Sequence, residues 1–433
     1  MKVAIAGFGL EGRVNYRYWH DLGHEVTIVD ERELPADDLP EGARVVVGNS
    51  VFDHLEEYDL VIRTAGLNPA KLKTDVDKIW SATNEFFAKC PAPIVGVTGT
   101  KGKGTTSSLI ASVFRAAGKT THLVGNIGTA ALDELPKIHA QDMVVYELSS
   151  FQLWDIKRSP EVAVILLIEP DHLNVHRDMD DYVAAKSNIR AFQADGDLCI
   201  YHPTNELSAQ AATVSTGGQL QRYAIPDDGG VYEKDGFFWQ GDQQICSKDA
   251  LQLLGQHNVE NACAAISVAK HYGVSNEAIE TGLRNFHGLP HRLELVRELD
   301  GVEYFNDSFS SAPSATLAAV RSFTVPEVII LGGTDKGADF SELIHDLADR
   351  QNIRRILVVG EIRDKLAKLL HKAGLESKTD VLTVRTMNEI VTAARQIAQP
   401  GDVVLLSPGC ASFDMFRNFY DRGDQFRELV NAL

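Results

Sequence analysis

A glycine-rich turn that contains a lysine, TGTKGKGTT at residues 98–106, is the segment of this chain best suited to chemistry. It follows the apolar run 94–97 and precedes a helix-like stretch at 107–117. The glycines let successive backbone N–H groups point at one spot, and the following helix directs its positive end there. Phosphate groups bind at such a spot, and Lys103 adds a mobile positive charge. The spacing therefore predicts that the chain binds a nucleoside triphosphate.

Further polar residues follow two other apolar strands. Glu147 comes after 144–146, and His172 comes shortly after 162–168. Ligands of open α/β sheets bind at the carboxyl edge of the strands, so we expect both side chains near the phosphate turn. A carboxylate there can hold Mg²⁺, which prefers oxygen ligands and bridges protein to triphosphate. The pattern alone also allows Glu147 to be a helix cap and His172 to be a structural histidine.

A second glycine turn, GFGLEG at 7–12, follows a predicted strand, opens a helix and has Asp30 at the end of the next strand. In a dinucleotide fold such glycines admit a pyrophosphate to the helix N-terminus, and the acid contacts a ribose. The pattern is compatible with a nicotinamide cofactor, with another diphosphate ligand and with a merely structural turn. The separate phosphate turn at 98–106, in the next predicted domain, favours a nucleotide-diphosphate substrate over a redox cofactor at this first turn.

The composition limits the choice of partners and compartment. The chain has 433 residues, with 42 basic and 60 acidic side chains and a net charge of −18, which argues against nucleic acid or an anionic membrane as a partner. Its five cysteines form no CxxC pair, so a disulfide framework or a zinc site is not expected. The N-terminus does not resemble a signal peptide, and the run 162–168 is far shorter than the roughly 18 residues of a membrane span. We expect a cytoplasmic protein.

Short β-rich runs alternate with helical stretches along the whole chain, which predicts an α/β protein of parallel sheets covered by helices. The length predicts more than one domain. We place the domains at 1–90, 91–289 and 290–433. The expected strands are 3–6, 25–29, 44–47, 60–63, 94–97, 144–148, 162–168, 198–202, 302–306, 328–331, 356–359, 381–384 and 403–407, with a hairpin at 231–239. The expected helices include 11–22, 107–117, 257–272 and 276–286.

Taken in order, these motifs resemble the Mur ligases of peptidoglycan synthesis, and the resemblance spans all three predicted domains. The motifs are GTKGKGTT, ELSSFQL, PDHLN, YVAAKSNI, GQHNVENA, GLPHRLE, NDS, GGTDKGADF and LSPGCASFDMFRNFYDRGDQF. The resemblance implies a Rossmann-like N-terminal domain that binds a UDP-sugar, a central P-loop ATPase-like domain and a C-terminal Rossmann-like domain that binds an amino acid. LSPGCASFD and GGTDKGADF are most similar to the branch that adds D-glutamate to UDP-N-acetylmuramoyl-L-alanine.

The resemblance also implies a reaction. ATP phosphorylates a substrate carboxylate, and an incoming amine then displaces phosphate to form an amide. Two Mg²⁺ ions are expected, held with the help of Thr105, Glu147 and Lys186. His172 would either share in the second metal site or orient the acyl phosphate. Lys186, which by itself would be interpreted as a solvated surface charge on a helix, would be carbamylated by CO₂ and so become an anionic ligand. Lys103, Glu147, His172 and Lys186 would be the catalytic residues, in a protein that acts as a monomer.

The resemblance implies substrate-binding residues in each domain. Those expected at ATP are Gly99, Thr100, Lys101, Gly102, Lys103, Gly104, Thr105 and Thr106 of the loop, Asn258 and Asn261 at the adenine, and Arg292 and Asp307 from the hinge and the third domain. Those expected at the UDP-sugar are Leu10 and Glu11 at the diphosphate, Asp30 and Arg32 at the uracil, Thr64 and Gly66 closing the pocket, and Asn126, Ser149 and Gln152 at the muramoyl part. Those expected at D-glutamate are Ser311, Lys336, Ser412, Phe413 and Phe419. The pattern alone also allows the last two to be core aromatics.

Five positions depart from the pattern of the D-glutamate branch. Gly104 stands in place of a hydroxyl residue, so that Thr105 would have to supply the metal ligand. Lys101 and Leu167 each stand in place of an asparagine, and Phe309 replaces a lysine after NDS. Glu11 stands where a small hydroxyl is common, and its carboxylate beside a diphosphate would be repulsive unless it turns away.

Three alternative functions remain open at this point. GKG followed by a hydroxyl residue is closer to folylpolyglutamate synthetase, a relative that would join L-glutamate to a folate. GFGLEG with Asp30 is compatible with an NAD-dependent oxidoreductase. A nucleotide-binding regulator without catalytic activity would bind ATP and release no phosphate.

Overall fold

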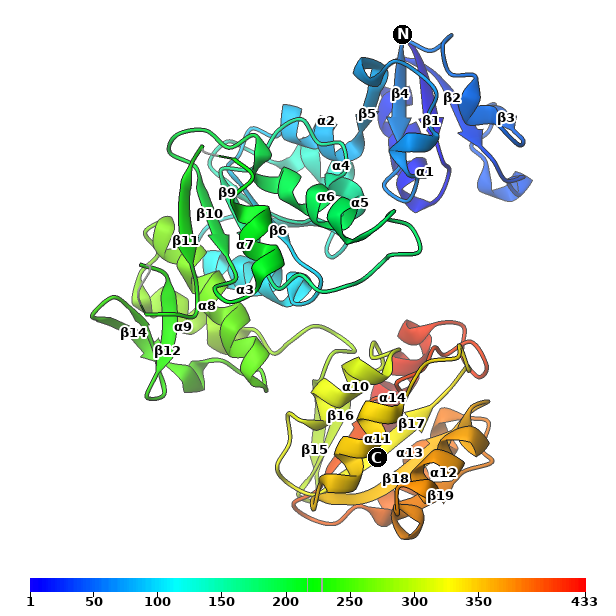
Figure 1. Cartoon of the computed structure of the whole chain (residues 1–433), viewed down its shortest axis with the longest axis vertical. Helices are drawn as coiled ribbons and strands as arrows, with labels where there is room; N and C mark the ends of the chain where they lie inside the picture. The colour runs from blue at the N-terminus through cyan, green and yellow to red at the C-terminus, as the bar shows by residue number, and fades with distance from the viewer. Residues whose placement is uncertain (216, 227–228) are drawn as a thin grey trace. The chain divides into compact units, whose positions relative to one another are not determined.

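The computed structural model describes residues 1–215, 217–226 and 229–433. This part of the chain forms three largely parallel sheets and one small antiparallel sheet, which confirms the predicted α/β class (Figure 1). Its backbone contacts divide it into two compact units: Met1–Leu251 with Gln256–Phe286, and Gln252–Gly255 with His287–Leu433. We describe each unit by itself.

The first sheet of unit 1 has the strand order β3-β2-β1-β4-β5, and all of its neighbouring strands are parallel. Its strands are β1 (Lys2–Ala6), β2 (Glu25–Asp30), β3 (Arg44–Val47), β4 (Leu60–Arg63) and β5 (Ile79–Ser81), and its helices are α1 (Leu10–Asp21) and α2 (Ala82–Lys89). The central strand β1 is completely apolar after its first residue because it is buried from both sides, as parallel strands are. The glycine turn 7–9 joins β1 to α1, as predicted.

The second sheet of unit 1 has the order β11-β10-β9-β6-β8-β7, again with parallel neighbours. Its strands are β6 (Ile94–Thr98), β7 (Thr121–Gly125), β8 (Met143–Glu147), β9 (Val162–Ile165), β10 (Leu198–Tyr201) and β11 (Gln219–Arg222). The helices of this part are α3 (Lys103–Ala116), α4 (Ala131–Glu134), α5 (Ser150–Leu153), α6 (Met179–Ala191), α7 (Glu206–Ala212), α8 (Gln256–His271) and α9 (Asn276–Asn285). Strand β6, which leads into the phosphate turn, lies between β9 and β8 and is entirely buried.

The predicted hairpin at 231–239 is present and gains a third strand. The strands β12 (Val231–Lys234), β13 (Phe237–Gln240) and β14 (Gln243–Ser247) form an antiparallel sheet. Lys234 and Phe237 pair across the turn that contains Asp235 and Gly236. Both turn residues have positive φ, which is the conformation of a tight hairpin turn.

Unit 2 contains one sheet of order β15-β16-β20-β17-β18-β19. Its strands are β15 (Glu294–Leu299), β16 (Val302–Asn306), β17 (Glu327–Gly332), β18 (Ile353–Val359), β19 (Thr379–Val381) and β20 (Val403–Leu406), and its helices are α10 (Pro313–Val320), α11 (Ser341–Asp349), α12 (Arg363–Lys372), α13 (Met387–Ile397) and α14 (Phe419–Ala432). The strands from β16 onward are parallel, and β15 is an antiparallel edge strand.

Four predicted boundaries were off by three or four residues. The expected strand 356–359 is β18, which begins at Ile353 because Ile353 and Arg355 also pair with β17. The expected strand 381–384 is β19, which ends at Val381, because its pairing with β18 places the polar Asp380 inside the strand and leaves 382–384 outside. The expected strand 162–168 ends at Ile165, because the next residues leave the sheet and contact the phosphate turn. The helix expected at 107–117 begins four residues earlier, at Lys103, directly after the glycine.

The predicted domain boundary at 289/290 lies close to the division between the two units, after Phe286. The predicted boundary at 90/91 separates the two large sheets of unit 1 and stays an interpretation, because both sheets belong to the same compact unit.

Two expectations from composition can be compared with the structure. All five cysteines carry free thiols, as predicted. In the part of the chain that the structure describes, no helix has both the length and the apolar character to cross a membrane.

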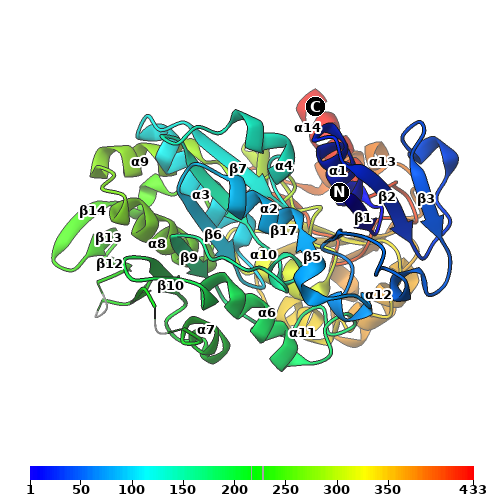
Figure 2. The ribbon, with the colours of Figure 1, turned by 90° about the horizontal axis from the view of Figure 1, so that it is seen from above.

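Helix α3, which begins at the phosphate turn, is held in place by close packing against α8 and α9, which lie beside it in Figures 1 and 2. The tightest contact is at Gly282 of α9. A Cβ atom added there would lie 2.4 Å from the Cα of Val113 and 2.8 Å from its backbone nitrogen. Ser112 of α3 also donates a hydrogen bond to the carbonyl of Gly282 at 2.7 Å. The two helix backbones therefore meet at a position that only glycine fits.

We expect Gly282→Ala to destabilise the protein by about 1–3 kcal/mol, because the added methyl group must push α9 away from the backbone of α3. The exposed Asn285→Ala on the same helix is the control and should change the free energy of unfolding by less than about 0.5 kcal/mol. Urea denaturation measures both. Alanine is intrinsically the better helix former by about 1 kcal/mol, so a stabilised Gly282→Ala variant would contradict the packing argument.

Candidate active site

The phosphate turn has the conformation that its glycines predict. Gly99 has φ of +148°, and Gly102, the N-cap of α3, is left-handed with φ of +84°. A Cβ atom on Gly99 would lie 2.7 Å from the Cβ of Leu166. The turn therefore requires glycine both for its backbone angles and for its close approach to the segment after β9. In the described part of the chain, no side chain caps the N-terminus of α3. Binding of a phosphate there stays a prediction.

Thr100 fixes the phosphate turn to that neighbouring segment. Its amide donates to the carbonyl of Leu167 at 2.8 Å. Its hydroxyl donates to the carbonyl of Glu169 at 3.0 Å, accepts from the amide of Glu169 at 2.9 Å and contacts the hydroxyl of Tyr182 at 3.0 Å. The turn and the segment that leads to His172 are thus one hydrogen-bonded assembly. Lys101 adds an exposed ion pair to Glu169 at 3.0 Å.

Two lysine side chains meet at one carbonyl of the turn. The Nζ of Lys103 donates to the carbonyls of Gly99 and Thr100, each at 3.0 Å. The Nζ of Lys186, from α6, donates to the same Gly99 carbonyl at 2.8 Å and lies 4.6 Å from the ring centre of Tyr182. The side chain of Lys186 is buried, with 1% of the residue exposed. The interpretation of Lys186 as a solvated surface charge, which its pattern alone favoured, is therefore wrong.

The surroundings of Lys186 favour its uncharged form. Burial lowers the pKa of the amine well below its usual value, and the neighbouring charge of Lys103 lowers it further. The carboxylates of Asp171 and Glu147 act in the opposite direction with smaller effect. Lys103, Glu147 and Asp171 are therefore all within electrostatic reach of Lys186, so that the residues predicted from separate motifs gather around one amine.

Glu147 is the last residue of β8 and is almost completely buried. In the sheet it lies opposite Val97 of β6 and Gly125 of β7. Because β6 ends one residue later and continues into the phosphate turn, Glu147 stands at the same carboxyl edge as the turn, where the sequence predicted it.

His172 is half-exposed and adopts a left-handed backbone with φ of +54°. Its amide donates to Asp171 at 2.8 Å, and its ring lies against Phe151 of α5 with the ring centres 5.0 Å apart. Its contribution to a metal site stays a prediction.

Sequence reasoning missed His176, four residues further on. The ring is buried between Asp181, 2.9 Å from Nδ1, and the hydroxyl of Ser150, 2.9 Å from Nε2, and it stacks on Phe151. Burial lowers its pKa, and the carboxylate of Asp181 opposes that effect. His176 connects the first residues of α5 and α6. Its spacing to His172 in the sequence was the signal that could have identified it.

The residues near Lys186 fit Mg²⁺ only if the nucleotide supplies most of the ligands. In the described ranges 1–215, 217–226 and 229–433, no three histidine, cysteine or acidic side chains are grouped as a metal site. Glu147 provides a buried carboxylate at the turn, and Thr105 is partly exposed at the start of α3. Thr106 is instead turned inward, where its hydroxyl donates to Asn261 at 3.2 Å. Mg²⁺ commonly takes one or two protein carboxylates and completes its shell with phosphates and water, so this donor set suits it.

The asparagines predicted at the adenine support the phosphate turn. Asn261 of α8 accepts from Thr106 and donates to Asn258 at 3.2 Å. A Cβ atom on Gly102 would lie 2.5 Å from the Oδ1 of Asn261. Helix α8 is therefore packed directly on the start of α3. A contact of either asparagine with adenine stays a prediction.

In the first sheet, Asp30 organises the glycine turn. Its carboxylate accepts from the amide of Phe8 at 2.8 Å, from the amide of Arg32 at 2.9 Å and from the Arg32 guanidinium at 3.3 and 3.4 Å. Burial opposes ionisation of Asp30, but these hydrogen bonds outweigh it and lower its pKa. The carboxylate is thus engaged by the protein, and Arg32, its partner, is exposed. A contact of either residue with uracil stays a prediction.

The orientation of Glu11 bears on the charge repulsion that a carboxylate beside a diphosphate would cause. Its carboxylate accepts from the amide of Ala65 at 2.7 Å, and burial raises its pKa. It therefore turns toward the loop after β4. Thr64 lies in that loop and donates to the carbonyl of Ala6 at 3.0 Å, whereas Gly66 and Leu10 are exposed.

The residues predicted at the muramoyl part lie together. Gln152 and Ser149 form a capping box at the start of α5, in which the Gln152 side chain accepts from the Ser149 amide at 2.9 Å. Asn126 also donates to the Gln152 side chain, at 3.3 Å. Three residues from two loops at the carboxyl edge of the central sheet thus share one hydrogen-bonded cluster.

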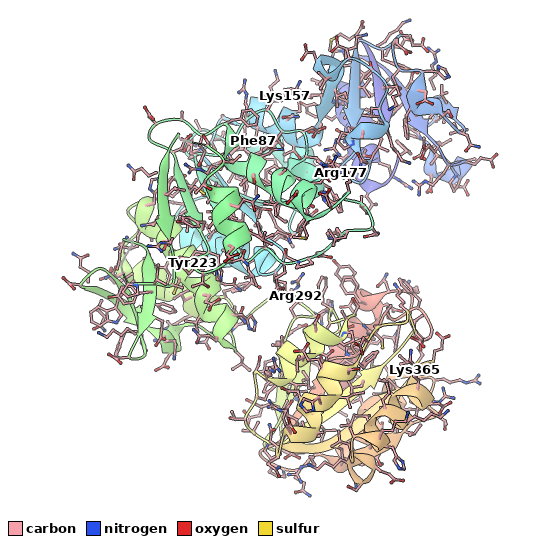
Figure 3. All side chains as sticks on the ribbon, in the orientation of Figure 1. Phe87, Lys157, Arg177, Tyr223, Arg292 and Lys365 are labelled. Carbon is pink, nitrogen blue, oxygen red and sulfur yellow. The ribbon has the colours of Figure 1, made fainter. Side chains whose placement is uncertain are left out.

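In unit 2 the predicted residues also follow the ends of parallel strands. Asp307 follows β16 and accepts from Ser407, which follows β20, at 2.6 Å. Burial raises the pKa of Asp307 to about 6 against the opposing hydrogen bonds of Ser310 and Ser407. Arg292, labelled in Figure 3, precedes β15. Its guanidinium lies 3.7 Å from the ring centre of Phe309. Phe309, which replaces a lysine of the family pattern, thus holds an arginine in place.

The residues predicted for D-glutamate lie in the segments that follow β16, β17 and β20. Lys336 has its Nζ 5.2 Å from the ring centre of Phe413. Phe413 is 64% exposed, so its interpretation as a core aromatic is wrong. Phe419 is partly exposed and packs edge-on against Phe309. Ser412 is buried and Ser311 is exposed.

Comparison with known proteins identifies two family domains in this chain. Residues 97–269 match the Mur ligase middle domain, and residues 291–410 match the Mur ligase glutamate ligase domain. The first range contains the phosphate turn, Glu147 and Lys186, and the second contains Asp307 and Lys336.

Individual proteins match over the full length. The chain is 36% identical to UDP-N-acetylmuramoylalanine--D-glutamate ligase of Clostridium kluyveri, an alignment that covers 100% of this chain and 97% of that protein. Among solved structures it resembles MurF from Acinetobacter baumannii, with a TM-score of 0.66, 18% identity and coverage of 99% and 90%, and MurF from Thermotoga maritima in complex with ADP, with a TM-score of 0.61, 16% identity and coverage of 99% and 95%. These two structures support the fold. The chain belongs to the Mur ligase family.

Proposed function

We propose that this chain is an ATP-dependent ligase that adds D-glutamate to UDP-N-acetylmuramoyl-L-alanine during synthesis of a peptidoglycan precursor. The observation that carries the proposal is the alignment with a D-glutamate ligase, which covers 100% of this chain and 97% of that protein. The grouping of Lys103, Lys186, Glu147 and Asp171 beside the phosphate turn supports it, because phosphoryl transfer needs such a charged site.

The proposed chemistry makes an amide from a carboxylate. A carboxylate is a poor electrophile, so the γ-phosphoryl group of ATP is first transferred to the terminal carboxylate of UDP-N-acetylmuramoyl-L-alanine, which yields an acyl phosphate and ADP. The amine of D-glutamate then attacks the acyl carbon. The resulting tetrahedral intermediate loses a proton from nitrogen and expels inorganic phosphate, and an amide bond remains.

Lys103 and the amides of the turn would hold the β- and γ-phosphates and stabilise charge during transfer. In the structure, Lys103 lies back on the carbonyls of Gly99 and Thr100. A phosphate group is a stronger partner for an ammonium than a neutral carbonyl, so we expect Lys103 to move onto the nucleotide when ATP binds.

Mg²⁺, when bound, would neutralise phosphate charge. Glu147 and Thr105 would hold it beside the turn, and a second ion would use His172 and Lys186. An ammonium cannot bind a cation, but an uncharged amine can add to CO₂ and release a proton to form a carbamate, whose single negative charge is shared by two oxygens. The lowered pKa of Lys186 supports that role, because the reactive form is the uncharged one.

The substrates would bind at the strand ends already described. The turns 7–12 and 64–67 would hold the UDP part, and the cluster of Asn126, Ser149 and Gln152 would hold the muramoyl part. Lys336, with its positive charge, would pair with a carboxylate of D-glutamate. A monomeric state and a cytoplasmic location stay predictions.

We expect the purified protein, given ATP, Mg²⁺ and UDP-N-acetylmuramoyl-L-alanine, to release phosphate only when D-glutamate is also present. A phosphate assay combined with product mass checks this, with L-glutamate in a parallel reaction. The same assay with a folate and L-glutamate tests the folylpolyglutamate alternative. Turnover with the folate, and none with the UDP-sugar, would overturn the proposal.

We expect Lys103→Ala to lower kcat by about 10²–10³-fold, because it removes a charge that stabilises phosphoryl transfer. Lys101→Ala in the same turn is the comparison, and we expect a smaller loss because Lys101 is exposed and already paired with Glu169. Steady-state phosphate release measures both. Equal losses of kcat in the two variants would contradict a specific role of Lys103 in phosphoryl transfer.

We expect Lys186→Ala to abolish turnover and a small carboxylate such as formate to restore part of it, because the added anion replaces the carbamate. The exposed helix lysine Lys368, changed to alanine, is the control and should behave like the parent. An active Lys186→Ala variant without any added anion would refute the carbamate.

A further inference from the structure

A buried arginine in unit 1 connects the two predicted binding regions for the UDP-sugar. Arg63 is the last residue of β4 and is fully buried. Its Nε donates to Asp155 at 2.6 Å, and its Nη2 donates to the other carboxylate oxygen of Asp155 at 2.7 Å and to the carbonyl of Phe151 at 2.8 Å. Asp155 follows α5 closely, so one edge of the guanidinium is bound to the segment at the end of that helix.

The opposite edge of the guanidinium shapes the turn 64–67. Nη1 donates to the carbonyls of Thr64 at 3.1 Å, Ala65 at 3.2 Å and Leu67 at 2.9 Å. Three carbonyls that converge on one nitrogen define the path of this short loop. The Ala65 amide is also fixed, by the carboxylate of Glu11. Backbone hydrogen bonds from the Thr64 amide to Ala6 and from the Leu67 amide to Thr64 add to these contacts. The side chains of Arg63 and Glu11 therefore help to fix the turn that would close the uracil pocket.

The segment around Asp155 is held in turn by α2. Asn84 donates from Nδ2 to the Asp155 carbonyl at 2.9 Å, and its Oδ1 accepts from the amide of Lys157 at 2.8 Å (Figure 3 marks Lys157). The Asp155 carboxylate is thus a fixed partner for Arg63. Through the capping box of α5, the same short helix also positions Ser149 and Gln152.

The chemistry of this position requires arginine. All five N–H bonds of the guanidinium have acceptors within hydrogen-bond distance, arranged around a plane. A lysine has one ammonium and could not reach both edges. A second ion pair, Arg17 of α1 with Asp133 of α4 at 2.6 Å, spans the same two parts of unit 1, but its side chains are 58% and 38% exposed. Like Arg63 and Asp155, this pair joins an arginine to an aspartate. It lacks the burial of the Arg63 pair and the additional contacts of Arg63 to carbonyl groups.

We propose that Arg63 and Asp155 are positioning residues that couple the turn 64–67 to α5, so that the two ends of the sugar nucleotide are held at one fixed separation. The inference rests on the proposed function, because it assigns the turn to the UDP part and α5 to the muramoyl part. Neither side chain touches the reacting atoms. Their effect is on the binding of a ligand that spans both regions.

The test uses Asp155→Asn, since the amide keeps the size of the side chain but loses its charge and sets an N–H₂ group against the arginine. We expect the Kd for UDP-N-acetylmuramoyl-L-alanine, measured by calorimetry, to rise about tenfold or more, as breaking a buried charged pair is costly. UDP alone reaches only one region, so its Kd should rise by a smaller factor. The Kd for ADP, which would bind at the phosphate turn, should stay within about twofold of the parent value.

Arg17→Ala is the matched control and should leave all three dissociation constants within about twofold of the parent values, as exposed ion pairs contribute little. Arg63→Lys is the second variant, with thermal unfolding recorded for each protein. Equal losses for UDP and for the full sugar nucleotide would overturn the coupling, as would an unchanged Kd for the full ligand. A parallel loss of ADP affinity would also overturn it, because it would indicate a general structural role.

The parent protein separates this inference from the proposed function. If the parent does not bind UDP-N-acetylmuramoyl-L-alanine, the proposed function itself is wrong and the inference falls with it. If the parent binds the ligand and Asp155→Asn binds it equally well, only the inference is wrong.

Discussion

The carbonyl of Gly99 is the point on which the rest of the site depends. Two lysines from distant parts of the chain, Lys103 and Lys186, donate to that one oxygen. The backbone can present it only because Gly99 has a positive φ and no side chain to strike Leu166. Burial lowers the pKa of the Lys186 amine, and the neighbouring charge of Lys103 lowers it further. The backbone conformation at Gly99 thus helps to hold a buried amine whose uncharged form is favoured.

The same edge of each parallel sheet collects the polar groups. In the central sheet it carries the phosphate turn and Glu147, and in unit 2 it carries Asp307 with Ser407. Parallel strands bring their carboxyl ends to one edge, where the loops are free to vary while the strands remain buried. Arg63 adds a connection between two such edges within unit 1, since it ends a strand of one sheet and holds the helix after a strand of the other. The buried charge of Arg63 fixes the positions of these segments, and the apolar sheets make the surrounding structure rigid.

The fold class, most strand positions and the phosphate turn could be predicted from the order of the amino acids alone. Apolar runs of four to seven residues between glycine turns can hardly form anything other than buried parallel strands when helices alternate with them. The turn was predictable because glycine, lysine and hydroxyl residues each have a separate physical reason to be there. Glu147 could be placed near it since it ends a strand. The resemblance to the family added the role of Lys186, which no local pattern would have favoured.

Only the tertiary structure decided where side chains point. Glu11 turns to the amide of Ala65, Phe413 is exposed, and His176 is buried between two helices, and each outcome depends on partners distant in sequence. The end of β9 at Ile165 could not be predicted either, because the apolar run continues past it: Leu166 contacts the phosphate turn and Ile168 is buried in the hydrophobic core. The periodicity of apolar residues indicates that a residue is buried, but it does not indicate which other residues bury it. Arg63 is the clearest case, for its six acceptors come from two separate segments that are brought together only when the chain folds.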